Sequence, residues 1–122
     1  MKIGYFDTKE FESKDGAKSP FGETVVRKEL VHLLNRIREK WDKPIIVNCA
    51  YRSPEHNRAV GGVKNLYHVQ GLAADIRPEI LEDLPELQDL CLDMVTDGGV
   101  GIYNTFVHVD ARGRRARWDE RG

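Results

Sequence analysis

The sequence lacks the features of a membrane protein. No stretch approaches the roughly 18 consecutive apolar residues that a membrane-spanning helix requires. Residues 1–11 contain no long apolar core and no small-residue cleavage site, so they predict no signal peptide. We therefore expect a protein that is made in the cytoplasm and does not insert into a membrane. Any action outside the cell would need another route of delivery.

An excess of charge of either sign is also missing. The 122 residues carry 19 Lys and Arg against 20 Asp and Glu, for a formal net charge of −1. A nearly neutral chain has no general attraction for nucleic acid. Basic residues do gather in RGRRARWDERG, residues 112–122, but Asp119 and Glu120 dilute them. We interpret this segment as a solvated tail rather than a nucleic-acid-binding arm, and we predict no nucleic-acid partner.

Cysteine is scarce. Two cysteines, Cys49 and Cys91, are too few for a disulfide framework. Each lies in an apolar stretch and is predicted to pack as a small buried thiol, with a disulfide between them as the less favoured alternative. The chain is 40% hydrophobic and 32% charged, a composition typical of a soluble globular protein. Its length suits one domain with its own core, so we expect a single domain over residues 1–122, and a monomer.

Hydrophobic periodicity divides the chain into helices and strands. Residues 7–10 carry a capping-box pattern, and residues 23–41 place apolar side chains at helical spacing until Asp42 and Pro44 end the helix. The order of elements favours an α+β fold with helices packed on one side of an antiparallel or mixed sheet. The other expected elements are strands over 44–51, 73–76, 98–103 and 106–111, a short helix over 53–60, a break at 61–65 and an amphipathic helix over 83–96.

The strand predicted over residues 106–111 carries a histidine outside the predicted core. In FVHVD the side chains alternate, so Phe106, His108 and Asp110 share one face while Val107 and Val109 share the other. The two valines suit the core. We therefore expect His108 to point to the opposite face, where a cleft could lie.

A second histidine, in YHVQGLAADI, adds to this set. His68 and Asp75 are separated mainly by small residues, and Gly71 lets a backbone and a metal approach closely. With His108 they provide two imidazoles and one carboxylate, a set that can bind zinc and leave one position for water. Zinc would lower the pKa of that water to about 7 and polarise a carbonyl. The residues alone leave another interpretation open, in which His68 caps a loop, Asp75 accepts backbone hydrogen bonds and His108 is an ordinary strand histidine.

Read together, two long segments resemble a known family. These are NCAYRSPEHNRAVGGVKNLYHVQGLAADI and GGVGIYNTFVHVDARGRRARW. They resemble the zinc-dependent D-alanyl-D-alanine carboxypeptidase-like proteins, peptidase family M15, in the short single-domain form of that family. The resemblance extends from YFDTKEFESKDG to Trp118. It implies the fold shared with the Hedgehog signalling domain, a Hedgehog/DD-peptidase-like antiparallel sheet with helices packed against it.

The resemblance also implies a site. It implies that His68, Asp75 and His108 bind Zn2+, and that Arg52, in YRS, lines the cleft and binds substrate or polarises its carbonyl. An arginine suits this role because its planar fork can hold a peptide carboxylate or stabilise a developing oxyanion. The alternative for Arg52 is a salt bridge that fixes the loop.

Some positions depart from the family pattern. Leu66 stands where many relatives have a small hydroxyl residue, and Cys49 and Ala50 stand where Ser-Gly is frequent. We expect these changes to alter the lining of the pocket without changing the metal ligands. His56 and Asn57 match the motif, and we interpret them as structural residues of the turn at 53–60.

The general base is harder to assign. Several branches of the superfamily carry Glu, Asp or His just before the last zinc histidine, whereas residues 104–106 here are Asn, Thr and Phe. Asp110 is the nearest carboxylate on the predicted face and is our candidate catalytic acid or base. Two alternatives remain, because Asp110 could instead anchor the following turn or hydrogen-bond to His108. Asp97 is a further candidate.

The predicted function is therefore a zinc-dependent metallopeptidase that hydrolyses amide bonds of bacterial peptidoglycan stem peptides, as a D-Ala-D-Ala carboxypeptidase or an endopeptidase. The small size and the missing export signal resemble a phage lysis or tail enzyme that is delivered to the cell wall. The rival prediction is a catalytically weak or inactive zinc-containing module of the same fold that binds cell wall or protein. The missing upstream acid favours the rival.

Overall fold

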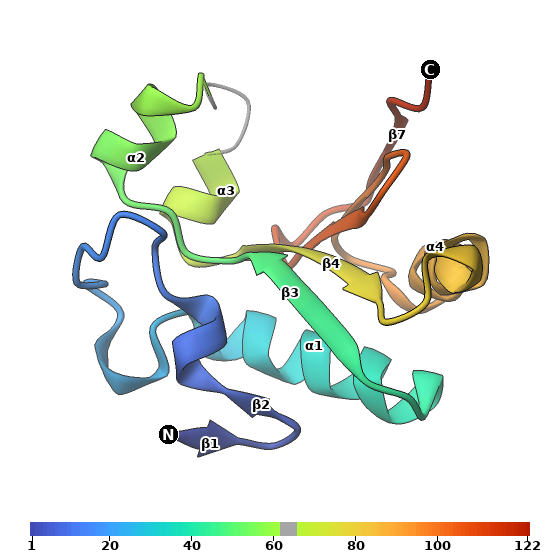
Figure 1. Ribbon diagram of the computed structural model, residues 1–122, viewed down its shortest axis with the longest axis horizontal. Helices are drawn as coiled ribbons and strands as arrows, with labels where there is room; N and C mark the ends of the chain where they lie inside the picture. Colours follow the sequence, from blue (N-terminus) through green and yellow to red (C-terminus); the bar gives the residue numbers. More distant parts are fainter. Residues whose placement is uncertain (62–65) are drawn as a thin grey trace.

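The computed structural model describes residues 1–61 and 66–122, and a mixed five-stranded sheet forms the centre of these residues (Figure 1). The strands are β1 Lys2–Ile3, β2 Phe6–Asp7, β3 Ile45–Cys49, β4 Ala73–Pro78, β5 Gly99–Ile102, β6 Val107–Asp110 and β7 Ala116–Asp119. The sheet has the order β3-β4-β6-β5-β7, and β1 pairs with β2 in a separate hairpin. Neighbouring strands are antiparallel except β5 and β7, which run parallel.

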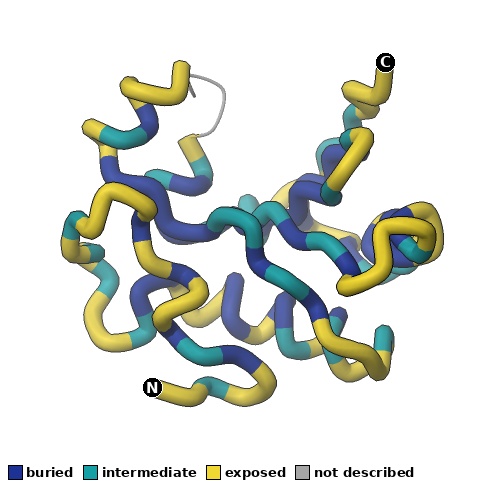
Figure 2. Tube along the Cα trace, viewed as in Figure 1, coloured by how far each residue is buried: buried dark blue, intermediate teal, exposed yellow. Residues whose placement is uncertain are grey.

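Two long helices cover one face of the sheet (Figure 1). The helices are α1 Lys28–Trp41, α2 Pro54–Ala59, α3 Leu66–Val69 and α4 Leu84–Met94, with single 3-10 turns at Thr8–Phe11, Gly22–Thr24 and Leu81–Asp83. Buried residues concentrate in the strands of the sheet and recur along α1 and α4 (Figure 2). The short helices α2 and α3 lie near the end of the sheet where β3 stops and β4 begins.

The face of the sheet toward α1 and α4 carries the core. Val107 and Val109 are fully buried there, with Ile76 of β4, and they pack in one cluster with Leu34 of α1 and Leu87 of α4. Burial of each such side chain contributes about 1.5–3 kcal/mol, so this face largely determines which way the strands turn. Residues that alternate with these valines point to the other face, as predicted for His108.

Most predicted elements are confirmed. The capping box of Asp7 and Glu10 caps the first 3-10 turn, and Asp42 ends α1 in a left-handed conformation. Ser53 caps α2, whose first residue is Pro54. The strands predicted at 44–51, 73–76, 98–103 and 106–111 and the helix at 83–96 are present, with shorter ends or, for β4, an extension to Pro78. The predicted break at 61–65 falls largely on residues 62–65, outside the described residues.

The main helix begins later than predicted. It starts at Lys28 rather than at residue 23, because Val25 has a positive φ of 68° and residues 22–24 form a 3-10 turn. The hydroxyl of Thr24 donates a hydrogen bond to the carbonyl of Val26, which stabilises this turn outside the helix. Val26 is nevertheless fully buried, so it has the burial, but not the helical backbone, that its spacing predicted.

The C-terminal segment is not the solvated tail that we predicted. Residues 116–119 form β7, which pairs with β5 and makes the sheet mixed rather than antiparallel. Arg117 donates hydrogen bonds to the carbonyls of Leu92 and Val95, which lie at the end of α4, and to the carbonyl of Gly98. The indole of Trp118 donates to the hydroxyl of Tyr103 at 2.9 Å. Basic side chains therefore attach this segment to the domain by satisfying backbone carbonyls.

The two cysteines are free thiols, so the alternative of a disulfide between them is wrong. Cys91 is fully buried, as predicted, whereas Cys49 is only partly buried. In the part of the chain that the structure describes, no helix combines the length and apolar character needed to cross a bilayer.

Candidate metal centre

One row of residues crosses the whole sheet and defines the site. The register pairs Cys49 with Asp75, Asp75 with His108, His108 with Gly101, and Gly101 with Trp118. Residues directly opposite each other on neighbouring strands share a face. We call these five residues the central row. Because its neighbours along β4 and β6 face the core, the central row lies on the face away from α1 and α4.

His68 reaches the central row from α3. Between α3 and β4 the chain passes close to another side chain at Gly71, which explains the glycine there. Gly71 has a φ of +70°, and a Cβ there would lie 2.7 Å from the ring of Phe21. The backbone N–H of Arg52 also donates to the carbonyl of His68 at 3.2 Å, which ties α3 to the end of β3. The imidazole of His68 is thereby fully buried, with Nε2 3.3 Å from Oδ1 of Asp75.

The hydrogen-bond partners of His68 assign its tautomer. Nδ1 lies 2.7 Å from the carbonyl oxygen of Ala50. A carbonyl only accepts, so Nδ1 carries the proton and Nε2 of the neutral ring has a free lone pair. Nε2 is buried and has no hydrogen-bond partner among the described residues. Its lone pair faces the carboxylate of Asp75.

The imidazole of His108 contacts an acidic side chain at each of its ring nitrogens. Its Nε2 lies 2.8 Å from Oδ2 of Asp110, and its Nδ1 lies 3.1 Å from Oδ1 of Asp75. Both nitrogens face a carboxylate, and the shorter contact, to Asp110, favours the proton on Nε2, which leaves the lone pair of the neutral ring on Nδ1. Nitrogens from His68 and His108 thus converge on a single oxygen of Asp75, with the two rings at 77° to each other.

This arrangement fits a divalent metal. Two lone pairs and a carboxylate oxygen repel one another unless a cation or a proton lies among them. Imidazole nitrogen and carboxylate oxygen are ligands that zinc accepts, and the second nitrogen of each ring is already held by an acceptor, as is usual for metal-binding histidines. The structure places His68 and His108 each beside Asp75, but the set of ligand atoms that all lie within 4.8 Å of one another is that of Cys49, His68 and Asp75, without His108. The role of the three predicted residues as zinc ligands stays a prediction.

Without a metal, a proton can satisfy the same contacts. Burial lowers the pKa of His68, but the carboxylate of Asp75 more than offsets it and raises the pKa to about 10. Burial likewise raises the pKa of Asp75, but hydrogen bonds from His108 and His68 outweigh it and hold the pKa well below its usual range. A metal ion that binds here competes with this proton.

Asp110, our candidate catalytic residue, is fully buried and makes many hydrogen bonds. Its Oδ1 accepts from the backbone N–H groups of Gly99 and Arg112 and from Nε of Arg112, and its Oδ2 accepts from Nη2 of Arg112 and from His108. These bonds hold the pKa of Asp110 well below its usual range, although burial alone would raise it. A Cβ at position 99 would lie 2.4 Å from the carboxylate, so the glycine makes room for it. The contacts agree with both alternatives, because Asp110 anchors the following turn through Arg112 and also hydrogen-bonds to His108.

Arg112 connects the two segments that carry the histidines, and the sequence did not single it out. Its guanidinium lies over the ring of Tyr67, 4.3 Å from the centroid, and near that of Trp118, 5.3 Å away. Tyr67 precedes His68 in α3, and Trp118 packs against the ring of His108 at 5.1 Å. Arg112 therefore contacts both sides of the centre while it binds Asp110 with two parallel N–H groups.

Arg52 lies beside Cys49, and its predicted place in a substrate cleft stays a prediction. Its Nη1 donates to Oδ1 of Asn57 at 3.2 Å and its Nη2 donates to Sγ of Cys49 at 3.4 Å. Among the described residues no acidic side chain forms an ion pair with it, which does not support the alternative of a salt bridge. Asn57, interpreted as structural, orients Arg52. Arg52 is buried, and its Nε has no hydrogen-bond partner among the described residues.

Cys49 belongs to the centre, which the sequence did not predict. Its Sγ lies 3.8 Å from Nδ1 of His68, and ligand atoms of Cys49, His68 and Asp75 all lie within 4.8 Å of one another. Burial raises the pKa of the thiol, but His68 and Arg52 more than offset this and leave the pKa below its ordinary value. Regular alternation along the strand would place Cys49 with Val47 in the core, but a bulge between them changes its face.

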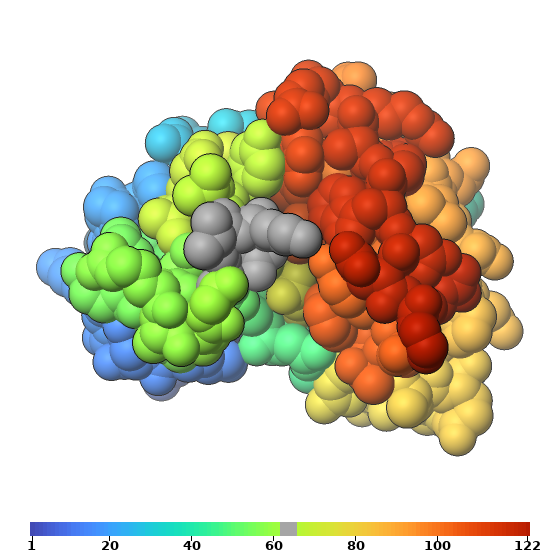
Figure 3. Space-filling view, turned by 90° about the horizontal axis from the view of Figure 1, so that it is seen from above, coloured from blue at the N-terminus to red at the C-terminus, as the bar shows by residue number. Residues whose placement is uncertain are grey.

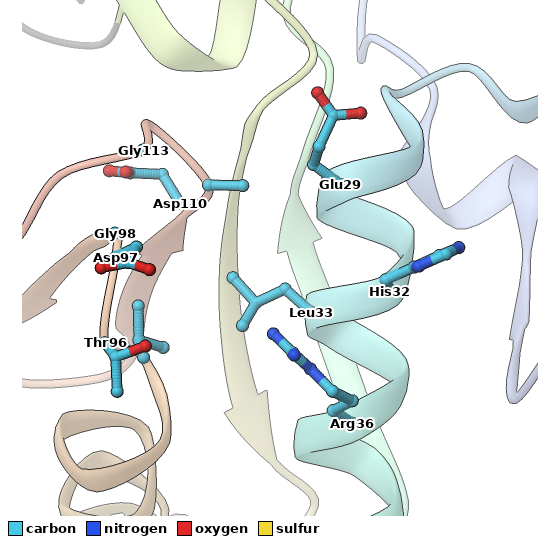
Figure 4. Close-up of a pocket in the computed structure, with 11 residues that line it drawn as sticks. Glu29, His32, Leu33, Arg36, Thr96, Asp97, Gly98, Asp110 and Gly113 are labelled. Carbon is cyan, nitrogen blue, oxygen red and sulfur yellow. The ribbon is translucent and has the colours of Figure 1, made fainter.

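Asp97, the other acid considered as a base, lines a pocket that Asp110 also lines. It faces α1 across a hollow lined by Glu29, Leu33 and Arg36 (Figure 4). None of the three predicted zinc ligands lines that pocket.

In the space-filling view from above, α2 and α3 lie on one side of the molecule and the C-terminal strands on the other (Figure 3).

Comparison with protein families agrees with this geometry. The family model described as Peptidase M15 matches residues 4–110, which is most of the chain and includes every residue predicted for the site. The match confirms the predicted family resemblance. A comparison with curated proteins gives no match.

Proposed function

The chain belongs to the peptidase M15 family, and we propose that it is a zinc-dependent peptidase that hydrolyses amide bonds in the stem peptides of bacterial peptidoglycan. At the level of the family it is a metallopeptidase, with a group of side chains that can hold a metal. The Hedgehog/DD-peptidase-like form of the α+β fold is part of this proposal. One observation carries it: the nitrogens of His68 and His108 converge on Oδ1 of Asp75, and each ring is oriented by a second acceptor.

In this proposal His68, Asp75 and His108 bind zinc. Bound zinc would supply Lewis acidity, which polarises an amide carbonyl and lowers the pKa of water to about 7. Asp110 keeps the proton of His108 on Nε2, so that Nδ1 presents its lone pair, and Arg112 holds Asp110 in place. This assigns Asp110 a positioning role and leaves its use as a base without support from its contacts.

Arg52 binds an anionic part of the substrate in this proposal. Stem peptides end in a carboxylate, and a planar guanidinium can hold a carboxylate with two hydrogen bonds or stabilise a developing oxyanion. The absence of an acidic partner for Arg52 among the described residues supports this role, because its charge is not already neutralised. We further propose a substrate with a D-residue beside the cleaved bond, cut as a carboxypeptidase or an endopeptidase, and delivery to the cell wall by a phage-type route.

A zinc-containing binding module of the same fold is the second candidate. The observation that favours it concerns the acids that contact the centre. Of the described acidic side chains there, Asp75 is a proposed ligand, and both oxygens of Asp110 accept hydrogen bonds. Neither is therefore free to take a proton from water. Such a module would bind peptidoglycan or protein without cleaving it.

Hydrolysis of purified peptidoglycan separates these functions. We expect new amine groups to appear with the zinc-loaded protein, to stop with a chelator and to return with added zinc, and mass spectrometry of the fragments identifies the bond. His68→Ala should abolish both zinc binding and hydrolysis. His32→Ala is the matched control, because His32 is exposed on α1 and should change neither.

The outcomes are distinct. Zinc binding and attachment to peptidoglycan without release of amines would favour the binding module. Failure to bind zinc at all, or full hydrolysis by the His68→Ala variant, would overturn both functions as stated.

A further inference from the structure

We propose that Cys49 is a fourth metal ligand of this centre, whose thiolate can occupy the position that hydrolysis needs open. The inference rests on the proposed function, because it concerns the same metal. It adds a residue and a regulatory state that the predicted ligand set of His68, Asp75 and His108 does not contain.

The first support is the backbone of β3. Val47 pairs with Ile76, and Cys49 pairs with Asp75, so two steps along β3 correspond to one step along β4. Asn48 is the extra residue of this bulge. Val47 and Ile76 face the core, and the bulge turns the next paired residue, Cys49, to the opposite face with Asp75. Bulges are known to redirect side chains near active sites.

The second support is distance. Ligand atoms of Cys49, His68 and Asp75 lie within 4.8 Å of one another. Zinc binds sulfur at about 2.3 Å and nitrogen or carboxylate oxygen at about 2.0–2.2 Å in a tetrahedral arrangement, so two of its ligand atoms lie about 3.5 Å apart. Rotation of the Cys49 side chain about one bond can bring its sulfur to that separation.

The third support is the buried nitrogen of His68. Nε2 is fully buried and has no hydrogen-bond partner among the described residues. A buried polar atom without a partner is costly, and a metal ion is one group that removes the cost. Cys49 is therefore not an isolated thiol, since its sulfur lies 3.8 Å from Nδ1 of the same imidazole ring whose Nε2 has no partner.

A fourth protein ligand changes what the centre can do. Zinc sites closed by four protein ligands are typically structural, whereas catalytic sites keep one position for water or substrate. When sulfur binds the metal, the S–H proton of Cys49 is released to solvent. When sulfur leaves the metal, Nη2 of Arg52, at 3.4 Å, remains as its hydrogen-bond partner. A ligand that engages Arg52 would remove this partner, which couples substrate binding to the state of the thiol.

Cobalt(II) provides the test, because thiolate ligands give Co(II) an intense charge-transfer absorption in the near ultraviolet that nitrogen and oxygen ligands lack. We expect this band in the Co(II)-loaded protein and its loss in Cys49→Ser. Cys91→Ser is the matched control. Cys91 is fully buried in the core cluster, so its removal should leave the band unchanged. X-ray absorption of the zinc-loaded native protein needs no variant and should show one sulfur at about 2.3 Å.

The failures of the two proposals are distinguishable. Binding of Co(II) and Zn2+ with no charge-transfer band and no sulfur neighbour would overturn the role of Cys49 while the proposed zinc centre stands. A band that persists in Cys49→Ser and is lost in Cys91→Ser would also overturn it. If native protein and Cys49→Ser both fail to bind either metal, the proposed function fails as well.

Discussion

Replacement of Asp110 by Asn tests how the centre is oriented. Asn keeps the size of the side chain, and its oxygen can still accept from the N–H groups of Gly99 and Arg112. Its NH2 group then takes the place of Oδ2 and faces Nε2 of His108. Because an amide N–H can only donate, Nε2 must become the acceptor and the proton must move to Nδ1. The nitrogen proposed to bind the metal then has no free lone pair.

The expected magnitudes follow from burial and contacts. Loss of a hydrogen-bond partner behind a metal-binding histidine typically weakens metal binding about 10–100-fold, or about 1.4–2.7 kcal/mol. The substitution also removes the counter-ion of Arg112. The side chains of this pair are 0% and 12% exposed, and breaking a buried pair costs about 3–5 kcal/mol. Since Arg112 keeps its contacts with Tyr67 and Trp118, we expect a loss of unfolding free energy near the lower end of that range.

The assay combines zinc competition with NMR. Competition with a chromophoric chelator gives the zinc affinity, and 15N spectra of the metal-free protein show which nitrogen of His108 carries the proton. Asp119→Asn is the matched control, because Asp119 pairs with Arg121 at the same sequence spacing but on the surface. A folded Asp110→Asn variant with native zinc affinity would refute the reasoning, as would a native His108 protonated on Nδ1.

Two further predictions concern the central row and the proton that a metal must displace. Gly101→Ala places a Cβ 2.4 Å from the indole of Trp118, so we expect denaturant titrations to show a loss of about 1–3 kcal/mol of unfolding free energy. The loss should be smaller when Trp118→Ala is already present. Equal losses in both backgrounds would contradict the predicted clash. Because the pKa of His68 is raised to about 10 in the metal-free protein, zinc must displace a proton at lower pH. In Cys49→Ser, where no thiol proton is released, we expect the apparent affinity to rise about tenfold per pH unit between about pH 7 and 9. Calorimetry in buffers of different ionisation enthalpy should count that proton, and an affinity independent of pH would contradict the assignment.

Local patterns in the sequence predicted much of the fold. Alternation in FVHVD assigned Val107 and Val109 to the core and His108 to the other face, because successive side chains of a strand point to opposite faces. Caps at Asp7 and Ser53 also acted locally. These signals depend on neighbours within a few residues, which is why the sequence alone revealed them.

Features that depend on distant contacts were missed. Arg112 lies in a basic segment that looked solvated, and only the approach of Tyr67 and Asp110 makes it part of the centre. The strand β7 was hidden for the same reason, because parallel pairing with β5 has no local signature comparable to a hairpin turn. The later start of α1 depends on the positive φ of Val25, which apolar spacing does not predict.

The bulge at Asn48 shows how one backbone irregularity changes the chemistry that a sequence implies. With regular alternation Cys49 would be an inert core thiol, and the centre would have the ligands of an ordinary catalytic zinc site. With the bulge, the thiol of Cys49 lies at one end of the central row. Asp110, next to His108, is already hydrogen-bonded to His108 and Arg112. Both features would disfavour hydrolysis. The thiol would compete with water for the metal as a fourth ligand, and Asp110 would not be free to act as a base. A centre with these neighbours would hold its metal tightly and hydrolyse slowly until the thiol is displaced.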